Sequence, residues 1–397
     1  MSSEHTILEH ISKITRLREG PEGIRRILQT VFRKGPISSK ALAQETYLPI
    51  PVVVAIRNEL KKQGIVEKSP SGTILSLEGL QLVIKELKFA TRADARCSQC
   101  KGQGLVLPND LEQIYHLFKD ICEGRPPLRP ELDQARTTPF TAFSRAMQMH
   151  EDGNLDGKQI LFLGDGDLVS IAARLLGNPK EVLVIDIDKK LVEHIRRTAI
   201  NNNIEIELQI LDLRNPLPST IQSKFDVFST DPPYTLQGSL LFLLRGLQLL
   251  KRRVGVAGYL SVRLSEFENL HALQSFLLSS GCVFREIKRG FNEYIGAEIL
   301  GNRSELFLFE AGSEFQNAIL DESILNLESS IYTGMIRRTI RTYKCKSCGA
   351  LHNVGMNQPQ QTIEELKSVG CATSTCGSKT FVLIDRKESP RSTNDDR

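Results

Sequence analysis

Residues 159–176 read QILFLGDGDLVSIAARLL, an apolar run followed by a turn with two glycines and a second apolar run. This order predicts a buried strand, a glycine turn and a helix. A second strand is predicted at 182–185, and the same rhythm continues beyond it. The remaining predicted strands are 206–211, 225–230, 256–262, 283–289 and 306–310. Strands that alternate with helices indicate an α/β fold, with a doubly wound parallel sheet and helices on both faces.

Acidic residues follow the first two predicted strands. In doubly wound sheets, ligands bind beyond the carboxyl ends of the strands, at the switch in strand order. Gly164 and Gly166 let the backbone approach a ligand closely there, and a carboxylate of the segment 186–188 (DID) can accept both hydroxyls of a ribose. Asp186 lies 22 residues after Gly164 (186 − 164), and dinucleotide sites have a similar spacing of about 20. On these residues alone, a nicotinamide cofactor stays open.

Two later segments favour a different cofactor. Asp212-Leu213, after the third strand, suits contacts to an adenine amino group. After the fourth strand comes 231–235, DPPYT, whose two prolines fix two backbone torsions and remove two N–H donors. Carbonyls and the Asp231 carboxylate can therefore face a substrate nitrogen. We predict an adenosyl sulfonium cofactor and alkyl transfer to nitrogen.

Four segments in order, 164–172, 186–188, 212–214 and 231–235, together resemble the branched-chain polyamine synthases, over residues of about 1 to 310. The resemblance implies a Rossmann-like sheet of the methyltransferase and aminopropyltransferase type. It also implies transfer of aminopropyl groups from decarboxylated S-adenosylmethionine to the N4 amine of spermidine, giving a tertiary amine and then a quaternary ammonium. The family's first motif usually reads Gly-Asp-Asp-Asp, whereas this chain has Gly166. We therefore assign the catalytic carboxylate of that motif to Asp167.

The proposed substrates are both cations, so their site should be acidic. A protonated amine has no lone pair, and Asp167 or Asp231 must accept its proton before attack. Tyr234 can offer an aromatic face to an alkylammonium chain, or it can simply pack against the prolines. The predicted catalytic residues are Asp167, Asp231 and Tyr234. The predicted co-substrate contacts are Gly164, Asp165, Gly166, Asp186, Asp188, Asp212 and Leu213, and the predicted substrate contacts are Asp165, Asp167, Asp231, Pro232 and Tyr234.

The flanking regions predict accessory domains. Residues 1–90 resemble a winged helix-turn-helix, with one helix starting near Ser38, a second at 51–63 and a wing tip at Gly72. Such a domain could read DNA, but few side chains on the second helix suit base readout, which favours a packing or dimerisation role. The other predicted regions are a connector (91–158), the catalytic domain (159–312), a helical linker (313–340), a zinc ribbon (341–386) and a disordered tail (387–397).

The spacing of the cysteine pairs predicts a metal site near the C-terminus. Cys345, Cys348, Cys371 and Cys376 form two knuckles whose four thiolates can close a tetrahedral shell, which indicates a structural zinc. His352 could replace a cysteine, but it is more typical of a surface residue. Cys97 and Cys100 supply only two ligands, so metal there stays open. The basic residues Arg337, Arg338, Arg341, Lys344 and Lys346 could contact nucleic acid or form a solvated face.

Overall composition restricts partners and location. The formal charge is only +4, from 51 basic and 47 acidic residues, so no global field favours nucleic acid or an anionic membrane. The longest apolar stretch, 238–250, contains Arg245 and is shorter than the roughly 20 residues that span a bilayer. The N-terminus lacks secretory features and the cysteine pairs suit a reducing compartment, so we expect a cytoplasmic enzyme. The expected partners are spermidine or a related polyamine and a second copy of the chain.

Two other functions compete with aminopropyl transfer. An N-methyltransferase could use the DPPY segment on an exocyclic amine of RNA or DNA. It would need a basic track leading to Asp231, but the four motif segments are acidic and Arg214 is their only cation. A non-enzymatic transcription factor would retain a degenerate central domain, and the intact Asp186, Asp212 and Asp231 argue against such decay.

Overall fold

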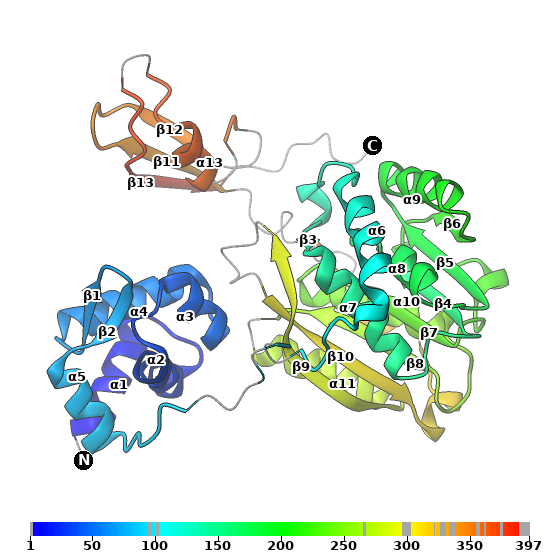
Figure 1. Ribbon diagram of the computed structural model, residues 1–397, viewed down its shortest axis with the longest axis horizontal. Helices are drawn as coiled ribbons and strands as arrows, with labels where there is room; N and C mark the ends of the chain where they lie inside the picture. The colour runs from blue at the N-terminus through cyan, green and yellow to red at the C-terminus, as the bar shows by residue number, and fades with distance from the viewer. Residues whose placement is uncertain are drawn as a thin grey trace. The chain divides into compact units, whose positions relative to one another are not determined.

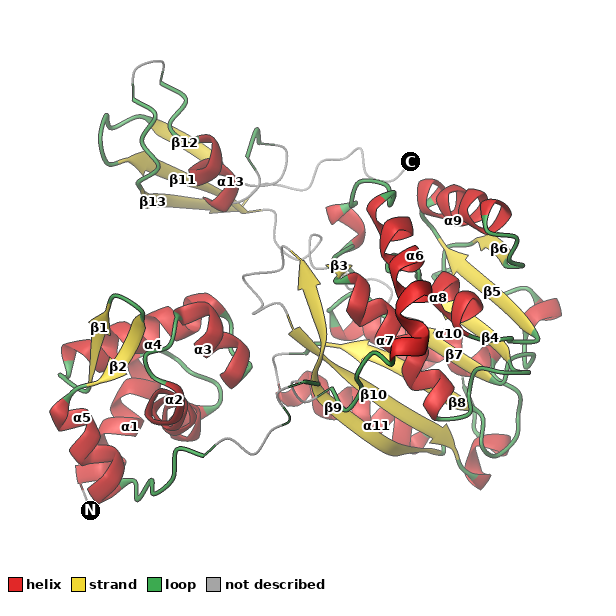
Figure 2. Cartoon of the chain, viewed as in Figure 1, coloured by secondary structure: helices red, strands yellow, loops and turns green. Residues whose placement is uncertain are grey.

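The computed structural model describes residues 3–93, 97, 99–100, 103–264, 267–295, 303–320, 322–325, 331–332, 339–354, 358–360, 363–373 and 376–388 (Figures 1 and 2). The chain divides into two compact units. The first comprises residues 1–128 and 134–326, and the second comprises 129–133 and 327–397. Among the described residues, no helix combines the length and apolar composition needed to cross a bilayer.

The first unit begins with a helical region that ends in a hairpin. Its elements are α1 (Ser3–Ile14), α2 (Gly20–Lys34), α3 (Ser39–Thr46), α4 (Ile50–Lys62), β1 (Val66–Ser69), β2 (Gly72–Leu75) and α5 (Leu77–Gln81). The Ser38 hydroxyl caps α3 by accepting from the Ala41 N–H at 3.1 Å. Gly72 has a φ of +142°, and a Cβ there would lie 2.4 Å from the Ile37 carbonyl, so the hairpin requires glycine. These elements fall where the sequence places two helices and a wing, and the winged-helix assignment itself stays a prediction.

An eight-stranded mixed sheet forms the rest of the first unit, in the order β3-β9-β10-β8-β7-β4-β5-β6. Parallel strands are β4 (Gln159–Leu163), β5 (Glu181–Asp186), β6 (Glu207–Ile210), β7 (Val227–Thr230) and β8 (Ala257–Val262). Antiparallel pairing adds β3 (Arg136–Thr137), β9 (Cys282–Ile295) and β10 (Arg303–Ala311). The fold is therefore Rossmann-like, as predicted.

The expectation of an all-parallel sheet is wrong. Strand β10 runs antiparallel to both of its neighbours, β8 and β9. Only residues 296–302 separate β9 from β10, whereas a parallel crossover needs about a dozen residues or more. The short connection therefore makes β10 antiparallel to β9, and in the sheet β10 lies between β8 and β9.

Helices cover both faces of this sheet (Figures 1 and 2). Helices α6 (Glu112–Glu123), α7 (Pro139–Glu151) and α8 (Val169–Leu176) pack together on one face. Helices α10 (Leu236–Leu249) and α11 (Phe267–Ser279) pack together on the other, and α9 (Lys189–Asn201) contacts β5 and β6. From β4 the chain winds outward to β5 and β6 and then returns to β7 beside β4. The carboxyl ends of β4 and β7 thus form the switch point where such sheets bind ligands.

The second unit is a small antiparallel sheet with one helix. Its elements are β11 (Thr339–Cys345), β12 (Leu351–Val354), β13 (Phe381–Glu388) and α13 (Ile363–Val369), with strand order β12-β11-β13. Tyr343, Val354 and Leu366 form its core. In the predicted linker, the described residues include 3-10 helices at Ser313–Asn317 and Glu322–Ile324. Arg337, Arg338 and most of the predicted tail lie outside the described residues.

Candidate active site

The turn after β4 is shaped by two left-handed residues. Gly164 has a φ of +69° and Leu168 one of +61°, so the chain reverses sharply into α8. Asp165 lies between them, and its carboxylate accepts from the backbone N–H groups of Val169 (2.8 Å) and Ser170 (3.2 Å). Burial raises the pKa of Asp165 to about 7. The Asp165 side chain therefore caps α8, whereas a Cβ added at Gly166 would meet no atom within 4 Å, so there is open space at that point of the turn.

The end of β5 is joined to this turn. The Asp186 carboxylate accepts from the backbone N–H groups of Asp165 (3.1 Å) and Asp188 (2.8 Å). Burial raises the pKa of Asp186 to about 6. Asp188 caps α9 by accepting from Lys190 N–H at 3.0 Å, and its other oxygen accepts from Gln134 at 2.9 Å. The structure therefore brings Asp165, Asp186 and Asp188 to one edge, as the sequence predicts.

The loop after β6 lies at the same edge. Arg214 donates to both Asp212 oxygens, with Nε–Oδ2 at 2.9 Å and Nη2–Oδ2 at 2.6 Å as the shortest contacts. Burial opposes ionisation of Asp212, but the Arg214 hydrogen bonds outweigh it and hold the pKa of Asp212 below its usual value. The Leu213 carbonyl accepts from the buried Arg245 Nε at 2.8 Å, and Leu211 N–H donates to the Asp186 carbonyl. These bonds fix the loop beside the end of β5.

The carboxylates of Asp167 and Asp231 meet at the switch point. Arg145, in α7, donates from Nη1 to Asp167 Oδ2 at 3.1 Å and from Nη2 to Asp231 Oδ2 at 2.8 Å. Asp167 Oδ1 also accepts from the Thr137 N–H at 2.8 Å and lies 3.5 Å from Arg125 Nη1. One guanidinium thus bridges the turn after β4 and the loop after β7.

Two tyrosines complete the surroundings of Asp231. Tyr294 OH donates to Asp231 Oδ2 at 2.7 Å and Tyr234 OH to Oδ1 at 3.2 Å. The two rings pack edge to face, with centroids 6.2 Å apart. Burial and the charge of Asp231 raise the pKa of both hydroxyls well above the usual value, so they remain donors. Tyr234 therefore does more than pack against the prolines.

Burial also raises the pKa of Asp231, and Asp167 adds to the rise while Arg145 and Tyr294 oppose it. Within the same segment, the Pro233 carbonyl accepts from Ser239 Oγ at 3.1 Å and Thr235 caps α10 through Gly238 N–H at 2.9 Å. The segment is thereby held by α10, and the buried carboxylate at its start, with its raised pKa, is a better proton acceptor than an ordinary aspartate.

The sequence motifs predict an acidic site, but the structure adds three cations to it. Arg125, Arg136 and Arg145 all interact electrostatically with Asp167. These cations lie at 125–145, in the predicted connector and outside the four motif segments, so they could not be read from the motifs. The same holds for Thr137, Asn292 and Tyr294. The available signal is the sequence of α7, PFTAFSRAMQMHE, where one arginine stands among residues that are buried on all sides. A lone charge in such a helix indicates a buried partner.

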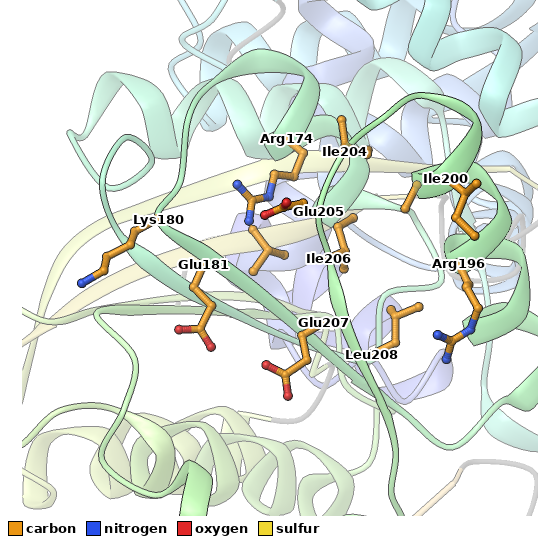
Figure 3. A pocket seen from close by; sticks show the side chains of 12 residues that line it. Arg174, Lys180, Glu181, Arg196, Ile200, Ile204, Glu205, Ile206, Glu207 and Leu208 are labelled. Carbon is orange, nitrogen blue, oxygen red and sulfur yellow. The ribbon is translucent and has the colours of Figure 1, made fainter.

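A pocket of about 470 Å³ lies elsewhere, at the amino ends of β5 and β6 (Figure 3). Arg174, Glu181 and Arg196 are among its lining side chains, and no predicted site residue lines it. Because ligands of such sheets bind at the carboxyl ends of the strands, this pocket is separate from the candidate active site.

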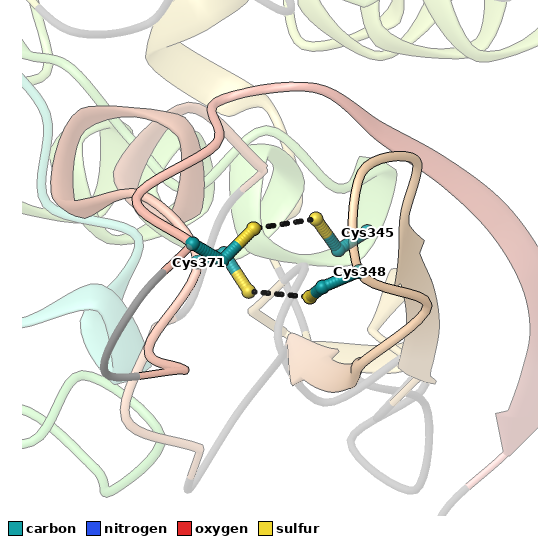
Figure 4. A group of neighbouring side chains, drawn as sticks. Cys345, Cys348 and Cys371 are labelled. Carbon is teal, nitrogen blue, oxygen red and sulfur yellow. Dashed lines mark hydrogen bonds between the residues drawn. The ribbon is translucent and has the colours of Figure 1, made fainter.

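The four predicted metal ligands converge in the second unit. The sulfurs of Cys345, Cys348, Cys371 and Cys376 all lie within 4.8 Å of one another. Cys345 Sγ is 3.7 Å from Cys376 Sγ, and Cys348 Sγ is 3.5 Å from Cys371 Sγ (Figure 4). A tetrahedral zinc site with metal–sulfur distances of about 2.3 Å requires sulfurs about 3.8 Å apart, and a disulfide about 2.05 Å. The cluster fits a metal and not disulfides.

His352 lies beside this cluster. Its Nε2 is 3.2 Å from Cys371 Sγ, and its ring packs against Phe381 with centroids 5.3 Å apart. The sequence favours a surface residue, and the structure places His352 at intermediate burial, in contact with a thiolate and a ring. The cysteines already supply four ligands, which leaves His352 as a neighbour that can donate to a thiolate.

Comparisons with known proteins agree on one family. The family model described as branched-chain polyamine synthase A C-terminal domain matches residues 113–345. The N(4)-bis(aminopropyl)spermidine synthase of Thermococcus kodakarensis is 35% identical over 293 residues, which are 73% of this chain and 82% of that protein. An uncharacterised protein of Methanocaldococcus jannaschii is 34% identical over 382 residues, which are 96% of this chain and 93% of that protein.

A solved structure agrees as well. The branched-chain polyamine synthase from Thermus thermophilus, in complex with N4-aminopropylspermidine and 5'-methylthioadenosine, matches with a TM-score of 0.68 and 26% identity, covering 84% of this chain and 98% of that one. The likeness therefore extends over most of both chains.

Proposed function

Because this chain belongs to the branched-chain polyamine synthase family, we propose that it transfers aminopropyl groups from decarboxylated S-adenosylmethionine to the N4 amine of spermidine or a related polyamine. The products are N4-aminopropylspermidine, then N4-bis(aminopropyl)spermidine, and 5'-methylthioadenosine. The observation that carries this proposal is the meeting of Asp167 and Asp231 in one buried hydrogen-bond network at the switch point of the sheet.

The carboxyl edge of the sheet has a side for the co-substrate and a side for the acceptor amine. Asp186, the last residue of β5, and Asp188, the cap of α9, would face the ribose. The loop carrying Asp212 and Leu213 would face the adenine. The transferred three-carbon group would then lie near Asp167, between the adenosine side and Asp231. Gly166 leaves the backbone open along this path, since a Cβ there would meet no atom within 4 Å. Asp165, which caps α8, would support the turn.

Asp231 is the better candidate for the proton acceptor. Asp167 already forms ion pairs with two guanidiniums and accepts from a backbone N–H, which makes it a site for charge stabilisation. Asp231 has a raised pKa and is reached by two hydroxyl donors. After Asp231 takes the proton of the secondary ammonium, the nitrogen lone pair attacks the methylene carbon bound to sulfur. The carbon–sulfur bond breaks, its electron pair neutralises the sulfonium, and the positive charge moves to nitrogen.

Tyr234 and Pro232 would shape the acceptor side. The Tyr234 ring stands edge to face against Tyr294, and its hydroxyl points to Asp231. An aromatic face beside a carboxylate suits an alkylammonium chain, since cation–π attraction adds to the ion pair. The carboxylates then stabilise the ammonium product.

The remaining parts of the proposal concern the rest of the chain. The cysteine cluster would hold a structural zinc, since four sulfurs leave no open position for chemistry. The N-terminal helices and hairpin would form a winged-helix-like domain with a packing or dimerisation role. We also propose that the enzyme acts as a homodimer in the cytoplasm.

The test is a product assay with two co-substrates. Purified protein is incubated with decarboxylated S-adenosylmethionine and spermidine, and the polyamines and 5'-methylthioadenosine are quantified by mass spectrometry. We expect masses that correspond to one and two added aminopropyl groups. Ordinary S-adenosylmethionine with RNA, DNA or spermidine serves as the parallel arm. Methylated nucleic acid in that arm, without branched polyamine in the first, would contradict the proposal.

A further inference from the structure

Arg145 contacts both carboxylates at the switch point through hydrogen-bonded ion pairs. We propose that Arg145 is a positioning residue that fixes Asp167 and Asp231 relative to each other and opposes the protonation of Asp231 until the acceptor amine binds. This inference rests on the proposed function, because it concerns the same transfer reaction.

The contacts use every nitrogen of the guanidinium. Nη1 donates to Asp167, Nη2 donates to Asp231 and also lies 3.3 Å from Tyr294 OH, and Nε donates to Asn292 Oδ1 at 2.8 Å. Arg145 is only 3% exposed, so water does not compete for these bonds. A planar fork sets the distance between two acceptors, which the ammonium of lysine cannot do.

Asn292 orients the guanidinium of Arg145. It is fully buried in β9, and its Nδ2 donates to Ser304 Oγ at 2.9 Å and to the Glu305 carbonyl at 3.1 Å. These bonds fix the amide so that its oxygen faces Arg145 Nε. The orientation of the guanidinium is therefore set by the antiparallel strands β9 and β10, and the two carboxylates receive one geometry.

The positive charge of Arg145 gives it a second role, which is to oppose the protonation of Asp231. The groups that face Asp231 are Arg145 from α7, Asp167 from the turn after β4, Tyr294 from β9 and Tyr234 from its own loop. Arg125 and Arg136 lie beyond, next to Asp167. Without Arg145, the Asp231 carboxylate would face Asp167 with no cation between them, and protonation would become easier. A protonated Asp231 cannot accept a proton from the amine.

The experiment compares Arg145→Lys and Arg145→Gln with the wild type in the polyamine assay. For Arg145→Lys we expect kcat to fall about 100-fold, since misplacement of reacting groups by about 1 Å costs that much, with KM changed less than about threefold. For Arg145→Gln we expect a larger fall in kcat. We also expect the acid limb of its pH–rate profile to lie at higher pH, because Asp231 is then more easily protonated. Guanidinium ions should restore part of the activity of Arg145→Ala. Arg196→Gln, an exposed change at the separate pocket, is the matched control and should keep the wild-type rate.

A second measurement does not depend on turnover. The Asp231 carboxyl is titrated by NMR in wild type and Arg145→Gln, with Asp231→Asn for assignment, and we expect the pKa of Asp231 to rise in the variant. An equal pKa in both proteins, or wild-type turnover in Arg145→Lys, would overturn the inference. Thermal unfolding and 5'-methylthioadenosine binding establish that each variant is folded. If the wild type makes no branched polyamine but the Asp231 pKa still moves, the proposed reaction fails and the charge role of Arg145 stands.

Discussion

The carboxyl edge of the eight-stranded sheet and the cysteine cluster of the second unit both gather polar side chains, but in opposite ways. The cluster takes four sulfurs from two short knuckles and brings them all within 4.8 Å of one another, as a tetrahedral metal site requires. The edge takes Arg145, Asp167, Asp231 and Tyr294 from four distant segments, and its donors and acceptors satisfy one another. A substrate cation must enter this second network and exchange partners with it. We therefore assign chemistry to the edge and structure to the cluster.

The sharpest way to break this comparison is to neutralise the proposed proton acceptor. Asp231→Asn keeps the size of the side chain but cannot take a proton, so we expect kcat to fall about 1000-fold, within the range for loss of a general base. Binding of 5'-methylthioadenosine, measured by calorimetry, should change less than about threefold. A variant that turns over at the wild-type rate would remove Asp231 from the mechanism.

Asp167→Asn should have a smaller effect. Its carboxylate stabilises charge beside Arg125 and Arg145, and the loss of one charge-assisted hydrogen bond, of about 1.5–3 kcal/mol, corresponds to roughly 10- to 150-fold in kcat. Steady-state kinetics of both variants in one assay give the ranking. If Asp167→Asn is the slower enzyme, the roles of the two aspartates are reversed.

The pH dependence follows from the same carboxylate. Burial raises the pKa of Asp231 above the ordinary aspartate range, and only its ionised form accepts a proton. The rate of the wild type should therefore rise with pH through that raised pKa, so its acid limb should lie above the range of an exposed carboxyl group. A kcat profile measured with spermidine at saturation tests this. A rate independent of pH down to the usual aspartate pKa would contradict it.

The strands and the motif loops could be predicted because each is formed by one continuous stretch of sequence. Apolar runs at 160–163 and 182–185 lie within β4 and β5 as the structure has them. The direction of β10 could not be deduced from its own residues, because antiparallel pairing depends on the short connection from β9. The role of Arg145 could not be predicted from the sequence for a related reason. Its partners Asp167 and Asp231 lie 22 and 86 positions away along the chain, and no local pattern records such a meeting.

The two glycines of the first motif allow a matched pair of alanine substitutions, with a moderate expected effect on the stability of the fold. Gly164 has a φ of +69° and a Cβ there would lie 3.2 Å from the Phe242 ring, whereas Gly166 has an ordinary φ and open space. Gly164→Ala should cost about 1–2 kcal/mol in the free energy of unfolding, because a side chain is strained in the left-handed region. Gly166→Ala should stay within about 0.5 kcal/mol. Denaturant unfolding measures both, and equal stabilities would show that the turn does not depend on Gly164.

Loss of the metal should affect turnover least. Cys371→Ser removes one of four thiolates, so we expect loss of the proposed zinc and faster hydrogen exchange across 339–388, since structural zinc contributes on the order of 10 kcal/mol to the folding of such sites. The kcat should change less than about twofold, because the sulfur contacts described above join the cysteines to one another and to His352, all within the second unit. Cys97→Ser is the control and should retain the metal, since Cys97 is not part of the cluster. Metal content, exchange and kcat are measured on the same preparations. A collapse of kcat with intact 5'-methylthioadenosine binding in Cys371→Ser would place the cysteine cluster in the reaction and end its assignment as purely structural.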